Sequence, residues 1–150
     1  MMNPPAPWNI PKQTHFNDGV DVGDCWRCCI AAVIGLPADQ VPHFLKESRA
    51  KGSSMDPETQ LWLNARGLIL VHSKEFHFPR WYGNNIPLPP VIACGPTERS
   101  RGMAKHHAVV MIADKMVYDP HPSDAGLTAV TDCYMVISAS CHLRQAEVKS

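Results

Sequence analysis

The segment that most constrains this chain covers residues 23–37, where an acidic, glycine-containing stretch changes abruptly into an apolar one. Ile30, Val33 and Ile34 recur with the spacing of one face of an α-helix. A glycine at position 35 and a proline at position 37 supply the usual stop signals. The sequence therefore predicts an apolar helix over residues 25–34.

Asp24 stands at the expected N-cap of this helix, which makes Cys25 the first helical residue. A thiol in that position faces unpaired backbone N–H groups and the positive end of the helix dipole. Both features favour the thiolate, the form of cysteine that acts as a nucleophile. Cys25 is therefore a candidate nucleophile, and the alternative is a semi-buried structural cysteine.

A histidine and a carboxylate lie further along the chain, at the two ends of an expected hairpin. Residues 106–112 form an apolar strand that begins with histidine, residues 113–114 can turn, and residues 115–118 form the returning strand. Such a hairpin brings His107 close to Asp119. Cysteine, histidine and aspartate in this order match the nucleophile, base and orienting group of covalent catalysis.

Two other histidines compete for the role of the base. In a strand, His107 shares a face with Val109 and Met111, whereas His106 would point the other way. His121, which follows the carboxylate closely, is the second rival. His107 is the preferred candidate.

Several of these motifs together resemble papain-like cysteine peptidases of the compact bacterial and phage type, which are related to the peptidases that trim double-glycine leaders. The resemblance covers residues 13 to about 127. It rests on Gln13-Thr14-His15-Phe16, Gly23-Asp24-Cys25, Gly35-Leu36-Pro37, Val41-Pro42-His43-Phe44, His107-Ala108-Val109-Val110 and Asp119-Pro120-His121-Pro122-Ser123.

The resemblance implies an α+β fold in which N-terminal helices carry the nucleophile and pack on a C-terminal antiparallel sheet. It implies a cysteine hydrolase of peptide or protein substrates with Cys25, His107 and Asp119 as its triad and no cofactor. Gln13 would donate to the oxyanion, with Asn17 as the competing amide. The backbone N–H of Cys25 would be the second donor.

Three further residues are candidates for substrate binding. Trp26 follows the nucleophile directly, and Trp81 lies in an irregular, proline-rich stretch over residues 74–90. Arg101 belongs to a basic loop with Arg99 and Lys105 that leads into the histidines and could recognise a carboxylate. The alternatives are aromatic side chains that pack on the core and a solvated basic loop.

The remaining pattern predicts helices over residues 41–50 and from a cap at Asp56 to residue 65. It also predicts a buried strand at 68–71, a central strand at 91–94 and a last strand at 128–138. We expect one domain over residues 13–140. A flexible proline-rich arm over residues 1–12 would precede it, and a flexible tail over 141–150 would follow it.

The charge balance, the apolar runs and the cysteine content further limit the classes of function that we expect. The 14 basic residues balance 14 acidic ones, so net charge gives no support for nucleic-acid binding. We see no apolar run typical of a signal peptide or membrane span, and therefore expect a cytoplasmic protein with no membrane partner. Its six cysteines are expected to be reduced.

Other functions remain open beside the hydrolase. Cys25-x-x-Cys28 is half of a zinc-site spacing, with Cys94, His72 or His77 as possible distant ligands, but no second Cys-x-x-Cys pair is present. A redox Cys-x-x-Cys site would need a thioredoxin-like strand before it. A catalytically inactive scaffold that binds a peptide or protein is the third alternative.

Overall fold

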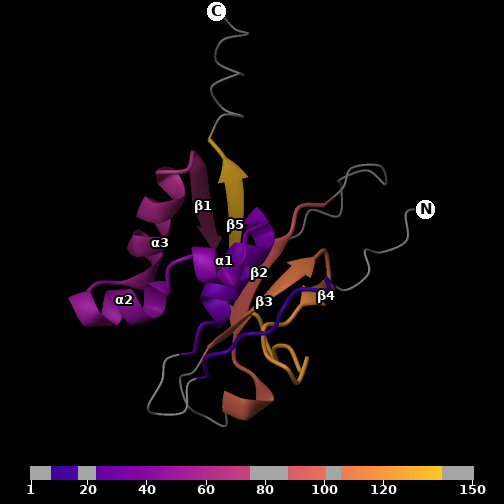
Figure 1. The fold of residues 1–150 in the computed structure, drawn as a ribbon. Coiled ribbons are helices and arrows are strands. Elements are labelled where there is room, and N and C mark those ends of the chain that lie inside the picture. The colour runs from indigo at the N-terminus through magenta and orange to yellow at the C-terminus, as the bar shows by residue number, and fades with distance from the viewer. Residues whose placement is uncertain (1–7, 17–22, 75–87, 101–105, 140–150) are drawn as a thin grey trace, which may run out of the picture.

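The structure of this protein is a computed structural model, which describes residues 8–16, 23–74, 88–100 and 106–139 (Figure 1). These residues form an α+β fold in which three α-helices pack on a five-stranded sheet. The helices are α1 (Cys25–Ile34), α2 (Phe44–Lys51) and α3 (Met55–Asn64), with short 3-10 turns η1 (Ala38–Gln40) and η2 (Glu98–Ser100). The strands are β1 (Leu68–Ser73), β2 (Val91–Gly95), β3 (His107–Ile112), β4 (Lys115–Tyr118) and β5 (Asp132–Ser138).

The sheet is antiparallel throughout and has the strand order β1-β5-β2-β3-β4. The expected central strand is confirmed, because β2 lies between β5 and β3. The hairpin of β3 and β4 is also confirmed, with Ala113 at its turn in the left-handed region at a φ of 54°. β1 was expected to be buried but lies at an edge, so that Val71 is 43% exposed.

Helix α1 has the bounds that the sequence predicts, and Gly35 ends it at a φ of 75°. The prediction that Asp24 stands at the N-cap is confirmed, but its side chain does not cap the helix. Instead, Oδ1 accepts from the backbone N–H of His15 at 3.2 Å, and the backbone N–H of Asp24 donates to the His15 carbonyl. Asp24 thus ties the N-terminal segment to the first turn of α1.

The other two helices begin later or earlier than expected. α2 starts at Phe44 rather than residue 41, because the His43 side chain caps it by accepting from the backbone N–H of Lys46. α3 starts at Met55, with Ser54 at the N-cap position. Asp56 is not the cap, since its carboxylate accepts a hydrogen bond from the Tyr134 hydroxyl at 3.1 Å.

Part of the segment expected to be a flexible arm is packed against β4. Trp8 donates its backbone N–H to the carbonyl of Val117, and Tyr118 donates its hydroxyl to the carbonyl of Pro11. Trp8 and Ile10 also pack on the hydrophobic core. These apolar side chains explain why residues 8–12 lie on the sheet. Residues 1–7 and the expected tail at 141–150 lie outside the described part of the chain.

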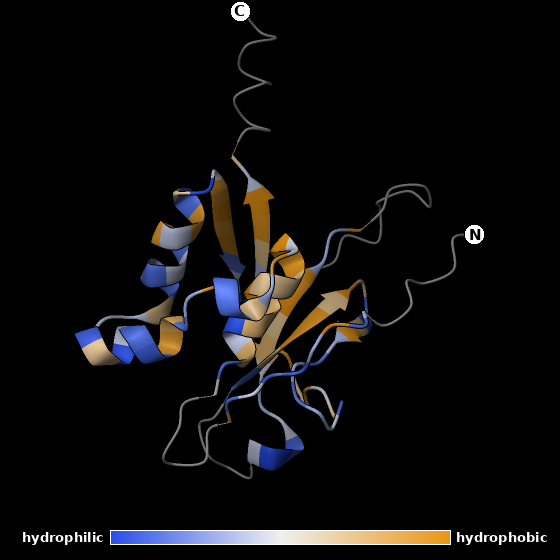
Figure 2. Cartoon of the chain, viewed as in Figure 1, coloured by the Kyte–Doolittle hydropathy of each residue, from blue (hydrophilic) through white to orange (hydrophobic). Residues whose placement is uncertain are grey.

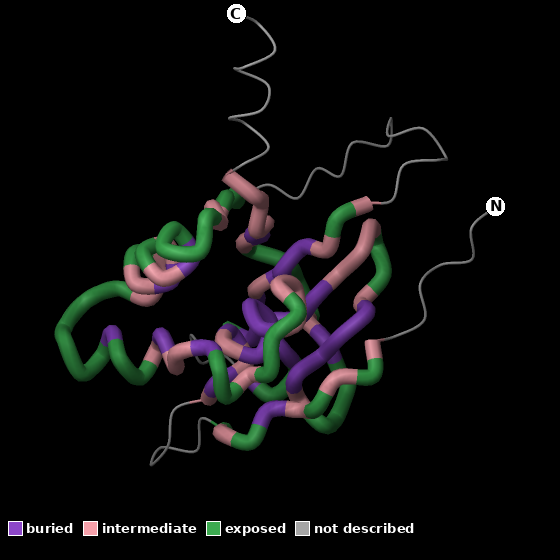
Figure 3. The backbone as a smooth tube through the Cα atoms, turned by 45° about the horizontal axis from the view of Figure 1, so that its top comes forward, coloured by how far each residue is buried: buried purple, intermediate pink, exposed green. Residues whose placement is uncertain are grey.

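The hydrophobic core fills the space between the helices and the sheet (Figures 2 and 3). α1 is its centre, since Cys29 and Ile30 have no exposed surface. Alternate residues of β2 and β3, such as Ile92, Ala108 and Val110, supply the sheet side. The core therefore holds α1 against β3, the strand that begins with His107.

Gly95, the last residue of β2, lies opposite His107 in the sheet. A Cβ atom placed there would be 1.9 Å from the carbonyl oxygen of Ala129. We expect Gly95→Ala to lower the free energy of unfolding by about 2–3 kcal/mol, because the backbone after β4 must move to make room. Chemical denaturation measures this change. Gly35→Ala is the control, since its added Cβ meets no atom within 4 Å and only the left-handed φ is unfavourable. Equal losses in both variants would contradict the steric argument.

Among the described helices, none is by itself long and apolar enough to cross a membrane. Cys25–Ile34 and Ala38–Lys51, which are bent by 99° relative to each other, meet the length and composition criterion only as a pair.

Candidate active site

Cys25 lies at the first position of α1 and lines a cavity of about 250 Å³. Its side chain is partly exposed, whereas the next cysteines along the helix, Cys28 and Cys29, are buried. The backbone N–H of Cys25 belongs to the first turn, whose donors have no partner within the helix. The cavity is also lined by Gln13, Phe16, Gly23, Leu45, Thr97, Arg99, Ser100, His106, His107 and His121.

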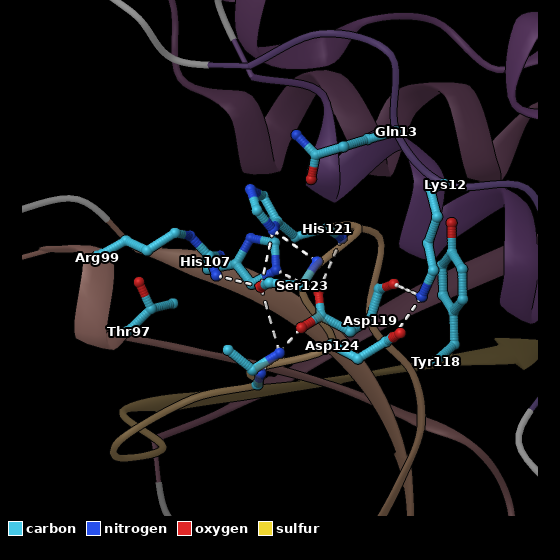
Figure 4. A network of polar contacts seen from close by, with 12 residues as sticks. Lys12, Gln13, Thr97, Arg99, His107, Tyr118, Asp119, His121, Ser123 and Asp124 are labelled. Carbon is cyan, nitrogen blue, oxygen red and sulfur yellow. Dashed lines mark hydrogen bonds and ion pairs between the residues drawn. The ribbon is translucent and has the colours of Figure 1, made fainter.

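His107 and Asp119 meet beside this cavity, as the hairpin pattern predicts (Figure 4). His107 is the first residue of β3 and Asp119 directly follows β4. The Nε2 atom of His107 lies 2.7 Å from Oδ1 of Asp119. The histidine is 8% exposed and the aspartate 1%, so little solvent screens the contact.

The carboxylate of Asp119 takes part in three hydrogen bonds. Beside its bond to His107, Oδ1 accepts from the backbone N–H of His121 at 2.8 Å, and Oδ2 accepts from the backbone N–H of Gly126 at 2.9 Å. Burial acts to raise the pKa of Asp119, but these three hydrogen bonds and the charge of His107 lower it to about 2. Asp119 is therefore ionised and fixed in one orientation.

The pKa of His107 is raised. Burial acts to lower the pKa of His107, but hydrogen bonds to Asp119 and Cys25 and the negative charges of both raise it to about 9. Because Nε2 is bound to Asp119, the other ring nitrogen is left for Cys25. The arrangement can hold a thiolate beside an imidazolium at neutral pH.

The structure places the two rival histidines in other surroundings. His106 is exposed and precedes β3, although it reaches the same cavity. His121 has its ring 6.3 Å from that of His107, edge to face, and its Nδ1 lies 2.9 Å from the hydroxyl of Ser123. Burial and the charges of Arg99 and His107 lower the pKa of His121. Of the three, His107 has the bond to a buried carboxylate.

Gln13 lines the cavity and is 7% exposed, with its carboxamide facing His107 and His121 (Figure 4). Its Nε2 donates to the carbonyl of His15 at 2.6 Å, which uses one of the two hydrogens on that nitrogen. Its Oε1 is buried and has no hydrogen-bond partner among the described residues. The competing amide, Asn17, lies outside the described residues.

The structure does not support Trp26 as a substrate-binding residue. Its side chain is 4% exposed, and its indole N–H donates to the hydroxyl of Thr59 at 3.0 Å. The ring packs edge to face on Tyr134, with centroids 4.7 Å apart. Successive residues of a helix point in different directions, so Trp26 does not face the same way as Cys25. Its side chain contacts Thr59 of α3 and Tyr134 of β5. Trp81 and Arg101 lie outside the described residues.

The other described cysteines carry no sign of a reactive or metal-binding role. Cys25, Cys28, Cys29, Cys94 and Cys133 are all free thiols. Burial raises the pKa of Cys28 to about 12 and that of Cys133 to about 11. Within the described ranges, no group of three or more His, Cys, Asp or Glu side chains is placed to hold a metal ion. His77, one of the distant ligands considered for zinc, is not among the described residues.

Three residues near the site, Arg99, Ser123 and Gly126, form hydrogen bonds that the sequence did not predict. Arg99 was noted only as part of a basic loop, but its Nη1 donates to the Ser123 hydroxyl at 2.8 Å and links η2 to the turn after Asp119. Gly126 holds Asp119 through its backbone N–H. The Arg99–Ser123 bond joins two separate loops, so no local pattern marks it, whereas the Gly126–Asp119 bond lies within the loop that follows β4.

Comparison of the chain with protein-family models, with curated proteins and with solved structures gives no match.

Proposed function

We propose that this protein is a papain-like cysteine hydrolase, acting as a peptidase, isopeptidase or amidase through Cys25, His107 and Asp119. The observation that carries the proposal is the 2.7 Å contact of the buried His107–Asp119 pair beside a cysteine at a helix N-terminus. The three groups come from the start of α1, the start of β3 and the residue after β4; Cys25 and His107 line one cavity, and Asp119 is bonded to His107. This is the order and division of roles of a nucleophile, a base and an orienting carboxylate.

In the proposed reaction, His107 takes the proton of Cys25 and Asp119 holds the resulting imidazolium. The thiolate Sγ forms a bond to the substrate carbonyl carbon, and the carbonyl π electrons move to the oxygen. The oxyanion accepts hydrogen bonds from the backbone N–H of Cys25 and from the second Nε2 hydrogen of Gln13. As the C–N bond breaks, the leaving nitrogen takes the proton from His107.

A water molecule then completes the cycle. It gives a proton to His107 and adds to the thioester carbon, and the collapse of this second intermediate expels the Cys25 thiolate. The product is a carboxylic acid, and Cys25 and His107 are left as the thiolate and imidazolium that attack the next substrate. An amine in place of water would make the same site a transferase.

Selective alkylation tests this proposal without a known substrate. Between pH 7.5 and pH 5.5 an ordinary thiol loses thiolate, and therefore reactivity, by about a hundredfold. We expect Cys25 to react with iodoacetamide at nearly the same rate at both pH values, because the neighbouring His107 imidazolium and the first-turn N–H groups of α1 favour the thiolate. Mass spectrometry after limited labelling measures the rate for each cysteine.

His107→Ala is the matched variant, since it removes the partner of Cys25 and leaves the thiol in place. In this variant the labelling of Cys25 should regain the steep pH dependence of an ordinary thiol. A second control, elemental analysis for zinc, addresses the metal-binding alternative. One equivalent of zinc per chain, with Cys25 and Cys28 both protected until a chelator is added, would refute the hydrolase.

A further inference from the structure

The cavity beside Cys25 has an unbalanced set of charges. Arg99 and three histidines, His106, His107 and His121, are among its lining residues, whereas no aspartate or glutamate is among those described. Asp119 is not among the lining residues, and its carboxylate is bonded to His107 and to the backbone N–H groups of His121 and Gly126. The described lining therefore offers hydrogen-bond donors and positive charge without an acidic side chain.

Arg99 is held in place although it forms no ion pair with any described residue. Its Nη1 donates to the hydroxyl of Ser123 at 2.8 Å, which leaves the other guanidinium N–H groups available. The acidic residue nearest in sequence to Ser123, Asp124, is paired with Lys12 instead. Arg99 thus has a fixed position at the cavity and no acidic partner among the residues that the structure describes.

His121 adds a second donor next to Arg99 (Figure 4). The backbone N–H of Ser123 donates to Nδ1 of His121 at 3.1 Å, so this nitrogen is the acceptor of the neutral ring. The ring proton then resides on Nε2. The ring also contacts Phe16 edge to face, with centroids 5.4 Å apart. His121 therefore keeps an N–H donor whose orientation is set by Ser123 and Phe16.

We propose that Arg99 and His121 form a carboxylate-binding subsite, so that the substrate carries a carboxylate close to the bond that is broken. A planar guanidinium beside a second N–H donor matches the two oxygens of a carboxylate. The cavity volume of about 250 Å³ is below the usual range for drug-sized ligands and fits a short acidic group. This inference rests on the hydrolase function proposed above.

The test compares two alkylating reagents of similar size, the anionic iodoacetate and the neutral iodoacetamide. The measured quantity is the ratio of their rates at Cys25, which cancels differences in the reactivity of the thiol itself. We expect Arg99→Gln to lower the iodoacetate-to-iodoacetamide ratio roughly tenfold, because a charge-assisted contact to the reagent's carboxylate is lost. His107 remains in both proteins, so its attraction for the anion does not contribute to the change.

Arg49→Gln is the matched control. Arg49 is exposed in the last turn of α2, and its replacement changes the net charge by the same amount away from the cavity. The ratio should stay at the wild-type value in this variant, fall to a lesser extent in Arg99→Lys, and fall about threefold in His121→Asn.

The outcomes separate this inference from the proposed function. If iodoacetamide still labels Cys25 selectively but the ratio is the same in Arg99→Gln as in the wild type, the carboxylate subsite is wrong and the hydrolase stands. An equal fall of the ratio in Arg49→Gln would also overturn the subsite, since it would reduce the effect to net charge. Loss of selective labelling of Cys25 in the wild type would refute both.

Discussion

Replacing Cys25 or His107 by alanine is expected to reduce turnover by a factor on the order of 10⁵, because the groups of a catalytic triad act as a unit. A panel of peptide, isopeptide and glutamine-amide substrates measures this loss. Asp119→Asn should be milder, since it keeps an oxygen that can accept from His107. Turnover in the wild type should fall as the pH rises through about 9, where His107 loses its proton.

The variants differ in their expected stability. Cys25→Ala should keep the thermal midpoint near that of the wild type, because the side chain is only partly buried. His107→Ala should lower it, because the carboxylate of Asp119, 1% exposed, loses its charged partner. Normal turnover in His107→Ala, together with loss of turnover in His106→Ala or His121→Ala, would assign the base to another histidine.

Gln13→Ala is expected to lower kcat by about a hundredfold with little change in KM, the effect of losing one oxyanion donor. The reason is that Gln13 lines the same cavity as Cys25 and that its Nε2 has a second hydrogen beside the one donated to the His15 carbonyl. Steady-state kinetics with a substrate that is turned over in this panel measures the separate effects on kcat and KM. Gln40→Ala, an exposed glutamine in η1, is the control and should have wild-type kinetics.

Gln13→Glu adds a sharper distinction. A glutamate cannot donate as an ionised group and would repel the oxyanion, so its rate should be no higher than that of Gln13→Ala. If Gln13→Glu instead retains activity, the useful atom of Gln13 is Oε1, which is buried without a partner among the described residues. An unchanged rate in Gln13→Ala with a loss in Asn17→Ala would transfer the donor role to Asn17.

Local patterns in the sequence determined the elements that carry the candidate site. The apolar spacing after Cys25 and the glycine at position 35 gave a helix with the observed bounds, Cys25–Ile34. The alternation around His107 gave β3, and the short turn gave the hairpin that brings Asp119 back to it. These features depend on interactions between residues a few positions apart, so they can be predicted from the sequence alone.

The predicted roles that the structure does not support depend on contacts between distant segments of the chain. Asp56 was expected to cap a helix, but the Tyr134 hydroxyl engages its carboxylate from another strand. Trp26 was expected at the substrate, but Thr59 and Tyr134 draw it into the core. At Asp56 a tertiary hydrogen bond outweighed a local capping preference worth about 1 kcal/mol.

The cavity shows most clearly which features follow from the local sequence and which depend on tertiary contacts. The amino-acid sequence alone identified a cysteine, a histidine and a carboxylate in an order suited to catalysis, because each occupies a recognisable helix or strand end. The bond from the backbone N–H of His121 to Asp119 spans two positions and is a local turn contact. Only the tertiary structure decided that the backbone N–H of Gly126 also reaches Asp119, and that Arg99 reaches Ser123 across 24 positions of the chain. The Arg99–Ser123 bond joins two loops, whose relative position no local sequence pattern encodes.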